Sequence, residues 1–176
     1  MSQASNQVKW CIIKAKKEIE ECEKQGKRKK HRGLLEISES IEIAKQHIEK
    51  AKHNLKAVNF LLKGDFSDLC ISTLFYAMYH CFLAIASKFG YESRNQTCTI
   101  ALIEWLKEEG KIEIDDKYLD MLKYADVVEK EEDSVIEMRE ESTYGIELSA
   151  ENMEKINQLI EDCKRLIDST MEILHG

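Results

Sequence analysis

Residues 69–86 read LCISTLFYAMYHCFLAIA, a stretch without a single formal charge. Its length is close to the roughly 20 apolar residues that a helix needs to cross a bilayer. It also contains Ser72, Thr73 and His80, and no basic cluster at either end sets a membrane orientation. The sequence therefore predicts a central helix that is covered on every face by neighbouring helices, and no membrane span.

Amphipathic helices are predicted on both sides of this central helix. Apolar side chains recur there at spacings of three and four residues, which places them on one helical face. The predicted helices span residues 7–25, 38–64, 65–88, 97–110, 115–139 and 149–174. The side chains expected to cap them are Ser38 or Ser40, Asp65 or Ser67, Thr97 or Thr99, Asp115 with Asp116, and Ser149. Residues 33–37 and 90–95 are predicted to be irregular connections.

The composition supports the same architecture. The chain of 176 residues has no proline and seven glycines, while 43% of it is apolar and 34% is charged. Folds with many β-turns need proline and glycine at their bends, so this composition disfavours them. We predict an all-α fold, an up-and-down bundle of five to six helices with an N-terminal helical extension. Residues 1–32 are assigned to the extension, an amphipathic helix with a basic connector, and residues 33–176 to the bundle.

Charge is spread unevenly along the chain. The net charge of −7 argues against a protein that coats nucleic acid over its whole surface. A basic run holds six cations without an acid between them: Lys24, Lys27, Arg28, Lys29, Lys30 and Arg32. Acidic residues dominate from position 104 to position 141. Both stretches are interpreted as solvated surface, with a phosphate-contacting arm as the alternative for the basic run.

The six cysteines show no metal-binding spacing. They form no C-x-x-C pair, and no histidine completes a zinc pattern beside a pair of thiols. We therefore expect free thiols in a reducing cytoplasm, no bound metal and no cofactor. The chain opens with MSQASNQ and shows no secretion signal, which also favours a cytoplasmic location.

A ladder of polar residues follows the central helix. Its members, Asp68, Ser72, Tyr76 and His80, are four residues apart and share one face of an otherwise apolar segment. One interpretation is a buried, hydrogen-bonded seam that fixes the packing of the bundle. The other is a polar wall at a cleft or at a dimer interface.

A second group of candidate residues begins at Arg139 and ends at Gly145. The guanidinium of Arg139 offers a rigid fork for a phosphate, and Tyr144 offers a hydroxyl and a ring on which a base can stack. The alternative is a surface network in which Arg139 pairs with Glu140 or Glu141.

Several segments together resemble the HEPN superfamily, named for higher eukaryotes and prokaryotes nucleotide-binding. The helix from Asp68 to Ala86 is similar to the signature helix of that superfamily. The segments that resemble archaeal stand-alone HEPN proteins are Lys9-Trp10-Cys11, Gly33-Leu34-Leu35, Thr97-Cys98-Thr99-Ile100 and Arg139 to Tyr144. The resemblance implies a helical bundle whose homodimer sets two copies of the arginine motif across a shared cleft. It also implies metal-independent RNA cleavage in many members, and a minimal nucleotidyltransferase as the antitoxin of some.

Two positions depart from the pattern of the catalytic members. Those members carry an arginine that is followed, after four to six residues, by a histidine, and this chain has Tyr144 at that place after Arg139. A histidine is also expected before Thr97, where this chain has Gln96. A tyrosine with a pKa near about 10 is a poor base at neutral pH, although it still donates a hydrogen bond. Both departures favour binding over cleavage.

The leading hypothesis is a cytoplasmic homodimer that binds RNA or a nucleotide. In its cleft, Arg139 and Tyr144 are the candidate catalytic and phosphate-contacting residues, and Asp68, Tyr76 and His80 belong to the binding wall. Metal-independent ribonuclease activity, as the toxin of a toxin–antitoxin module, is an open extension of this hypothesis. The alternative is a non-catalytic helical module that dimerises or binds another protein, such as a minimal nucleotidyltransferase.

Overall fold

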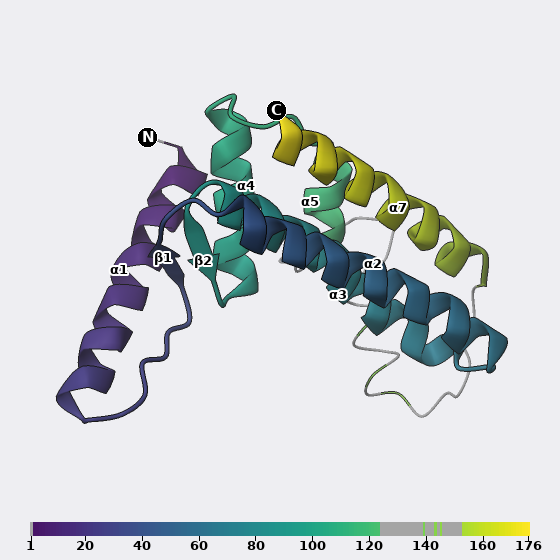
Figure 1. Ribbon diagram of the computed structural model, residues 1–176, viewed down its shortest axis with the longest axis horizontal. Helices are drawn as coiled ribbons and strands as arrows, with labels where there is room; N and C mark the ends of the chain where they lie inside the picture. Colours follow the sequence, from purple (N-terminus) through teal and green to yellow (C-terminus); the bar gives the residue numbers. More distant parts are fainter. Residues whose placement is uncertain (1, 124–138, 140–142, 144, 146–152) are drawn as a thin grey trace.

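A computed structural model describes residues 2–123, 139, 143, 145 and 153–176 of the chain (Figure 1). Within these residues there are six helices and two short strands. The helices are α1 (Gln3–Lys24), α2 (Ile41–Lys63), α3 (Ser67–Lys88), α4 (Gln96–Glu108), α5 (Asp116–Leu122) and α7 (Met153–His175). The strands are β1 (Leu34–Glu36) and β2 (Tyr91–Ser93). The predicted all-α bundle is confirmed, and four of the helices begin and end within a few residues of the predicted positions.

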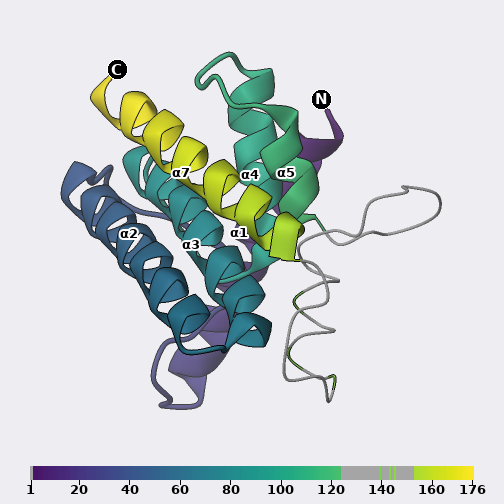
Figure 2. The same cartoon turned by 90° about the vertical axis from the view of Figure 1, so that its right-hand side faces the viewer.

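Helix α3 forms the centre of the bundle. Helices α2 and α7 pack along it, and α4 contacts it from the other side (Figure 2). Large side chains such as Leu74, Met78 and Phe82 have no exposed surface. Length and composition alone would let α3 cross a membrane, but most of its apolar stretch is buried among the other helices. The prediction of a core helix is confirmed, but not on every face: Leu69 and Tyr76 are 46% and 49% exposed, so one side of α3 is not covered by the described helices.

Two of the predicted N-terminal helix caps are found in the structure, and the one predicted for α4 is wrong. The Ser40 hydroxyl accepts a hydrogen bond from the backbone N–H of Ile43 at 3.2 Å, and Asp115 caps α5 in the same way, as predicted. Helix α4, however, is capped by Asn95, so the prediction of Thr97 or Thr99 is wrong. Thr99 is fully buried and its hydroxyl bonds to groups inside the fold, which is why it is not the cap.

The start of α3 has no side-chain cap. Its first flanking residue is Phe66, which makes no capping hydrogen bond, so the prediction of Asp65 or Ser67 is wrong. Asp65 instead takes a left-handed backbone conformation with φ of 62° and turns the chain between α2 and α3. Its side chain therefore does not stand where the first N–H groups of α3 could reach it.

The two segments predicted to be irregular pair as a small sheet. β1 and β2 are antiparallel, with Leu34 opposite Ser93 and Glu36 opposite Tyr91. Three residues are too few to show the alternation by which a strand is recognised in a sequence. The sheet ties the connector before α2 to the connector before α4.

The N-terminal helix α1 docks against α4 and β1. A disulfide joins Cys11 of α1 to Cys98 of α4, with their Cα atoms 5.9 Å apart. The prediction of free thiols is therefore wrong for this pair, because the bond links positions 87 residues apart that no local spacing connects. The other four cysteines are free, as predicted. Gly33 lies directly against the backbone carbonyl of Cys11, where a Cβ atom would collide with it.

Two predicted helices extend into residues that the structure does not describe. Helix α5 ends at Leu122, and most of the predicted stretch up to Arg139 lies outside the described residues, as does the predicted cap Ser149. The C-terminal helix is confirmed from Met153 onward. The boundary between an extension at 1–32 and a bundle at 33–176 stays a prediction.

Candidate functional site

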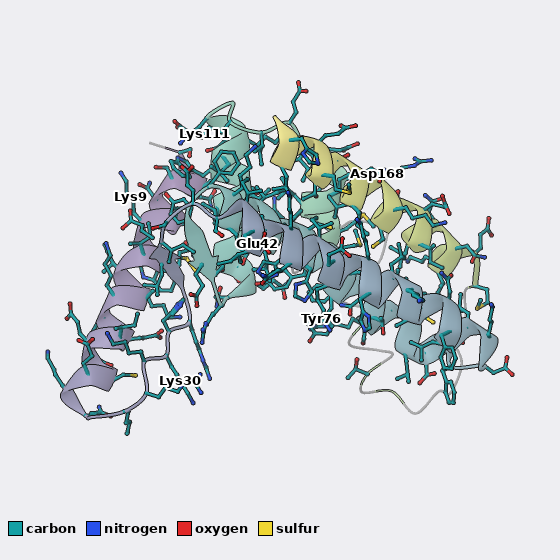
Figure 3. The ribbon with its side chains drawn as sticks, viewed as in Figure 1. Lys9, Lys30, Glu42, Tyr76, Lys111 and Asp168 are labelled. Carbon is teal, nitrogen blue, oxygen red and sulfur yellow. A yellow bond between two sulfur atoms is a disulfide. The ribbon has the colours of Figure 1, made fainter. Side chains whose placement is uncertain are left out.

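The polar ladder of α3 is not a buried seam. Tyr76 is 49% exposed, and Asp68, Ser72 and His80 are half-buried. The hydrogen bonds of Ser72 and His80 lead to other segments: the first bonds to Thr143, and the second bonds to α2. Tyr76 is also visible at the lower edge of the molecule in Figure 3. The interpretation as a wall open to a ligand or a partner therefore fits the structure better.

Arg139 lies on the same part of α3. Its guanidinium carbon is 4.6 Å from the centre of the Phe75 ring, a cation–π contact. The hydroxyls of Ser72 and Thr143 are 2.9 Å apart and hydrogen-bonded. These two contacts bring the described residues of the arginine motif against the first half of α3. We call Ser72, Phe75, Tyr76, Arg139 and Thr143 the α3 site.

Tyr144, the second candidate of the arginine motif, lies outside the described residues. Glu140 and Glu141 lie outside them as well, so the surface network proposed for Arg139 stays a prediction.

An aromatic cluster supports the ring under Arg139. Phe75 stacks on Tyr79, with ring centres 6.1 Å apart, and meets the edge of Tyr76 at 5.3 Å. The Tyr79 hydroxyl and the Thr99 hydroxyl are 2.9 Å apart, which anchors the cluster to α4. Burial raises the pKa of Tyr79, so this hydroxyl stays protonated at neutral pH. The platform that carries Arg139 is therefore fixed by the core and not by the surface.

Further along α3, His80 pairs with His47 of the neighbouring helix α2. Nδ1 of His80 is 3.0 Å from Nδ1 of His47 on α2, close enough for one ring to donate a hydrogen bond to the other. Burial, followed by the proximity of His47 and Lys50, lowers the pKa of His80 to about 4, and burial lowers that of His47. Both rings are thus neutral at pH 7, and one Nδ1–H donates the hydrogen bond that joins them.

Sequence reasoning missed His47. Its position on the inner edge of α2 shows no motif, and only the packing of α2 on α3 brings it to His80. The pair stands beside a hollow of about 200 Å³ between α2, the end of α3 and β2. Its walls include Ile43, His47, Leu83, Ser87 and Tyr91. The only signal for this pair in the sequence is that the predicted helix before α3 carries a histidine that could face His80.

Gln96, which stands where the resemblance led us to expect a histidine, has a structural role. Its side-chain amide donates a hydrogen bond to the backbone carbonyl of Leu122 at 2.8 Å, which ties the start of α4 to the end of α5. This contact explains how the side chain is used here. Among the described residues, no group of three or more histidine, cysteine or acidic side chains could bind a metal ion.

The geometry of the α3 site suits recognition of a phosphate. A guanidinium whose flat face rests on an aromatic ring can still donate hydrogen bonds from the N–H groups around its edge. Ser72 and Thr143 are hydrogen-bonded to each other, which leaves the hydroxyl hydrogen of one of them free to donate to a phosphate, and the exposed ring of Tyr76 offers a stacking surface. The neutral histidine pair supplies hydrogen bonds and no positive charge at pH 7.

Comparison with known proteins adds one finding. A family model described as HEPN domain matches residues 44–174. The match begins within α2 and ends within α7, so it includes α3 and Arg139 and leaves out α1 and the basic connector. No curated protein matches the chain.

Proposed function

The chain belongs to the HEPN domain family, and from this membership we propose that it binds RNA or a nucleotide as a homodimer. The binding cleft would include Arg139 and Tyr144, with Asp68, Tyr76 and His80 on its wall. The observation that carries the proposal is the cation–π contact of Arg139 with Phe75, because it presents a cation beside two hydroxyls and an exposed ring. The family's association with ribonuclease, toxin and nucleotide-related roles is consistent with this chemistry.

Dimerisation is supported by an apolar patch at the turn between α2 and α3. Phe60 is 78% exposed, Phe66 53% and Leu69 46%, and Tyr76, two helical turns after Leu69 on the same face of α3, is 49% exposed. Exposed phenylalanines that lie together on a surface are typical of an interface. HEPN domains commonly dimerise, so we propose that a second copy covers this patch and brings a second Arg139 to the same cleft.

Cleavage of the bound RNA would need more from the site than binding does. In metal-independent RNA cleavage, the 2′-oxygen loses its proton and attacks the adjacent phosphorus, and the 5′-oxygen leaves with a proton. Arg139 would stabilise the charge on the phosphorus oxygens, and Tyr144 would orient the phosphate. Burial, followed by the proximity of His47 and Lys50, lowers the pKa of His80 to about 4, so almost no imidazolium is present at pH 7 to protonate the leaving oxygen as a general acid. We therefore propose binding as the function and test cleavage alongside it.

The proposal is tested by RNA binding and RNA cleavage in EDTA. Arg139→Ala should weaken binding of a single-stranded RNA about 10- to 100-fold, the range for a charged hydrogen-bonded pair. Lys164→Ala, which removes an exposed cation from α7, is the matched control and should leave the affinity unchanged. Unaltered affinity in Arg139→Ala would rule out the cleft. Cleavage that is equal in wild type, Arg139→Ala and Tyr144→Phe would rule out a ribonuclease that uses these residues.

The second candidate function is a non-catalytic module that binds another protein, such as a minimal nucleotidyltransferase in a toxin–antitoxin pair. The same exposed patch at Phe60 and Phe66 favours it, since a partner could cover the patch as well as a second copy. Light scattering separates the two. A species of 20 kDa at micromolar concentration would contradict the homodimer, and a small nucleotidyltransferase gene beside this one would then favour the heteromeric pair.

We propose a cytoplasmic location for the protein. The family is generally soluble, and among the described residues the helix that is apolar enough to cross a membrane is the core helix α3. Disulfides are rare in the cytosol of mesophiles, but intracellular proteins of hyperthermophilic archaea are rich in them. The resemblance to archaeal proteins therefore makes the bond between Cys11 and Cys98 compatible with a cytoplasmic location.

A further inference from the structure

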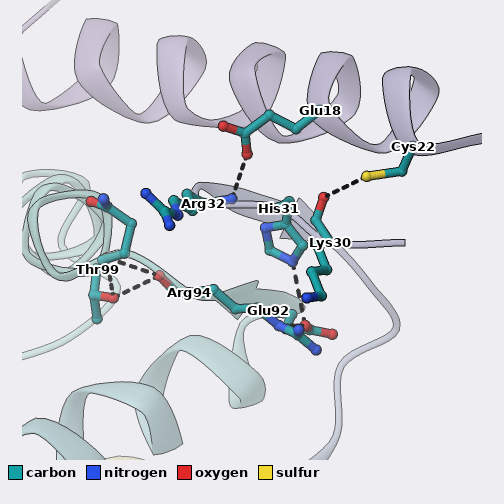
Figure 4. A network of polar contacts seen from close by, with 10 residues as sticks. Glu18, Cys22, Lys30, His31, Arg32, Glu92, Arg94 and Thr99 are labelled. Atoms are coloured by element: carbon teal, nitrogen blue, oxygen red, sulfur yellow. Dashed lines mark hydrogen bonds and ion pairs between the residues drawn. The ribbon is translucent and has the colours of Figure 1, made fainter. Parts of the chain in front are cut away.

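A strongly basic hollow lies beside the second half of α1. It is an open cavity of about 590 Å³ between α1, the connector that leads to β1, and the end of β2 (Figure 4). Five cationic side chains line it against two carboxylates. The cations are Lys27, Arg28, Lys30, Arg32 and Arg94. We call this cavity the basic hollow.

Backbone contacts fix the connector that carries these cations. The Glu18 carboxylate accepts a hydrogen bond from the backbone N–H of Arg32, and the Cys22 thiol lies 3.8 Å from the carbonyl of Lys30, to which it donates. Both contacts use the backbone of the connector and leave the cationic side chains unengaged. The side chains of Lys27, Arg28, Lys30 and Arg32 make no ion pair with any residue that the structure describes.

The opposite wall is organised around Glu92. Its carboxylate accepts from Nε of Arg94 at 2.7 Å and lies 3.3 Å from Nε2 of His31. Partial burial alone would raise the pKa of Glu92, but these hydrogen bonds outweigh it and lower the pKa, so the carboxylate stays charged. Glu92 thereby holds the base of Arg94 in place and offsets only part of the positive charge around the hollow.

His31 gives an independent sign of a missing ligand. Its side chain lines the basic hollow although only 6% of the residue is exposed. Nδ1 of this ring is buried and has no hydrogen-bond partner among the described residues. A buried polar atom without a partner costs about 1–3 kcal/mol, so such atoms are rare in native proteins. Because Nε2 donates to the Glu92 carboxylate, Nδ1 of the neutral ring is an acceptor, which a water ordered by a bound strand or a ribose 2′-hydroxyl would satisfy.

We propose that the basic hollow binds the phosphates of a single-stranded RNA backbone. The cations are spread over an open surface, which suits several phosphates in sequence, and no phenylalanine, tyrosine or tryptophan lines the hollow to stack a base. Recognition there is therefore independent of base identity. The inference rests on the proposed function, because it gives the RNA bound at Arg139 a second contact.

Four of the five cations of the basic hollow lie outside the family domain, and only Arg94 lies within it. Residues 27–32 precede the stretch that matches the HEPN family, which begins at position 44. In Figure 3, Lys30 and Tyr76 both lie on the lower edge of the molecule, on the side where α1 and α3 diverge. In the proposal, one strand runs along this edge and contacts both the α3 site and the basic hollow.

The test compares two variants that each remove an adjacent Lys–Arg pair. Lys27→Gln/Arg28→Gln removes two cations of the hollow, and Lys164→Gln/Arg165→Gln removes two exposed cations of α7. In fluorescence anisotropy with oligo-U and oligo-A RNA at about 0.1 M salt, the first variant should lose about 10- to 30-fold in affinity for both sequences. Its plot of log affinity against log salt should be flatter by about 1.4, the value for two phosphate contacts on a single strand. Equal losses in the two variants would overturn the proposal.

The same pair of variants is then measured in an Arg139→Ala background. If the α3 site fails but the hollow binds, the Lys27→Gln/Arg28→Gln loss persists while Arg139→Ala alone has no effect, so the two failures are distinguishable. If Arg139→Ala weakens binding and Lys27→Gln/Arg28→Gln does not, the basic hollow is refuted and the proposed function stands.

Alkylation of Cys22 gives a local readout. Cys22 lines the basic hollow and is partly exposed, whereas the other free cysteines, Cys70, Cys81 and Cys163, are buried. Oligo-U should slow alkylation of Cys22 in the wild type and not in Lys27→Gln/Arg28→Gln. Inorganic phosphate at the same phosphate concentration should give little protection. Equal protection by inorganic phosphate would mean a site for a single phosphate and would overturn binding of a strand.

Discussion

The α3 site and the basic hollow both present cations, but the two regions hold them in different ways. At the α3 site, Arg139 lies on a ring of Phe75 that the core of the bundle fixes through Tyr79 and Thr99. At the basic hollow, a connector without a core of its own is fixed by backbone hydrogen bonds to Glu18 and Cys22 and by the small sheet.

The difference shows how a short segment can gain a defined shape without burying much apolar surface. Helix α3 gains its stability from burial, which is the largest favourable term in folding. The connector depends instead on α1, and α1 is joined to the bundle by the disulfide between Cys11 and Cys98. Changes to the core should therefore affect the α3 site first, and changes to the disulfide should affect the basic hollow first.

The largest effect is expected from the core that surrounds α3. Phe82 has no exposed surface, and Phe82→Ala should lower the free energy of unfolding by about 3–5 kcal/mol, because it removes buried apolar surface and leaves a cavity. Phe60→Ala, on the exposed patch, should change it by less than about 0.5 kcal/mol. Urea unfolding followed by circular dichroism measures both. Similar losses in the two variants would contradict the description of α3 as the core.

The next effect is expected from the covalent link of the extension. Replacing both Cys11 and Cys98 by alanine should cost about 2–4 kcal/mol, because the bond closes a loop of 87 residues in the unfolded chain. Cys22→Ala should cost much less, since its thiol is half-exposed and free. The double variant should also weaken RNA binding at the basic hollow more than at Arg139.

Thiol titration of the denatured, unreduced protein checks the bond itself. Four thiols per chain should react, those of Cys22, Cys70, Cys81 and Cys163. Six reactive thiols would show that the bond does not form under the conditions used, and the predicted difference in stability should then vanish too.

A smaller effect is expected where the extension meets the bundle. Ser40 caps α2 directly after the connector from β1, and Ser40→Ala should cost about 1 kcal/mol. Ser38→Ala, two residues earlier and exposed, is the matched control and should be close to neutral. If the two serines proved equivalent in thermal unfolding, the hydrogen bond from Ile43 to Ser40 would contribute nothing measurable.

A further effect, confined to acidic pH, is a dependence of stability on pH at the histidine pair. The pKa of His80 falls from 6.5 to about 4 on folding, so the unfolded chain takes up the proton first as the pH decreases. The free energy of unfolding should therefore decrease between about pH 6.5 and pH 4, and it should not change with this group above pH 6.5. His80→Gln should reduce this dependence, whereas His53→Gln, at an exposed position on α2, should not.

NMR titration of the same ring gives the direct measurement. In His47→Gln the pKa of His80 should rise towards its usual value, because one of the groups that lower it is removed. A pKa of 6.5 in the wild-type protein would contradict the arrangement of the pair.

Patterns within single helices could be read from the sequence. The apolar run of residues 69–86 identifies α3, and the spacing of three and four identifies α2 and α7, because burial is periodic along a helix. Ser38 or Ser40 was predicted as the cap of α2 because both precede an amphipathic run, and the structure shows that Ser40 is the cap. The resemblance to HEPN proteins, carried by α3 and the segment at Arg139, agrees with the family match over residues 44–174.

Features that depend on two distant segments could not be read in this way. The disulfide joins positions in α1 and α4, and His47 meets His80 only after α2 packs on α3. Arg139 was predicted to contact a phosphate, but its position on Phe75 depends on a segment far along the chain that folds back onto α3. The cap of α4 was missed because the sequence offers Asn95, Thr97 and Thr99 as possible caps. Only the structure shows that Thr99 is buried inside the fold and that Asn95 is the cap.

The disulfide also changes what a break in the chain does. It closes residues 11–98 into a covalent ring that contains the whole basic connector, with its many lysine and arginine cleavage sites. A protease that cuts once within this connector opens the ring without releasing α1, because the helix stays bonded to α4. On a gel without reductant the nicked protein should migrate as one species, and with reductant as two. The exposed basic segment can therefore be cut once without the loss of the helix that shapes it.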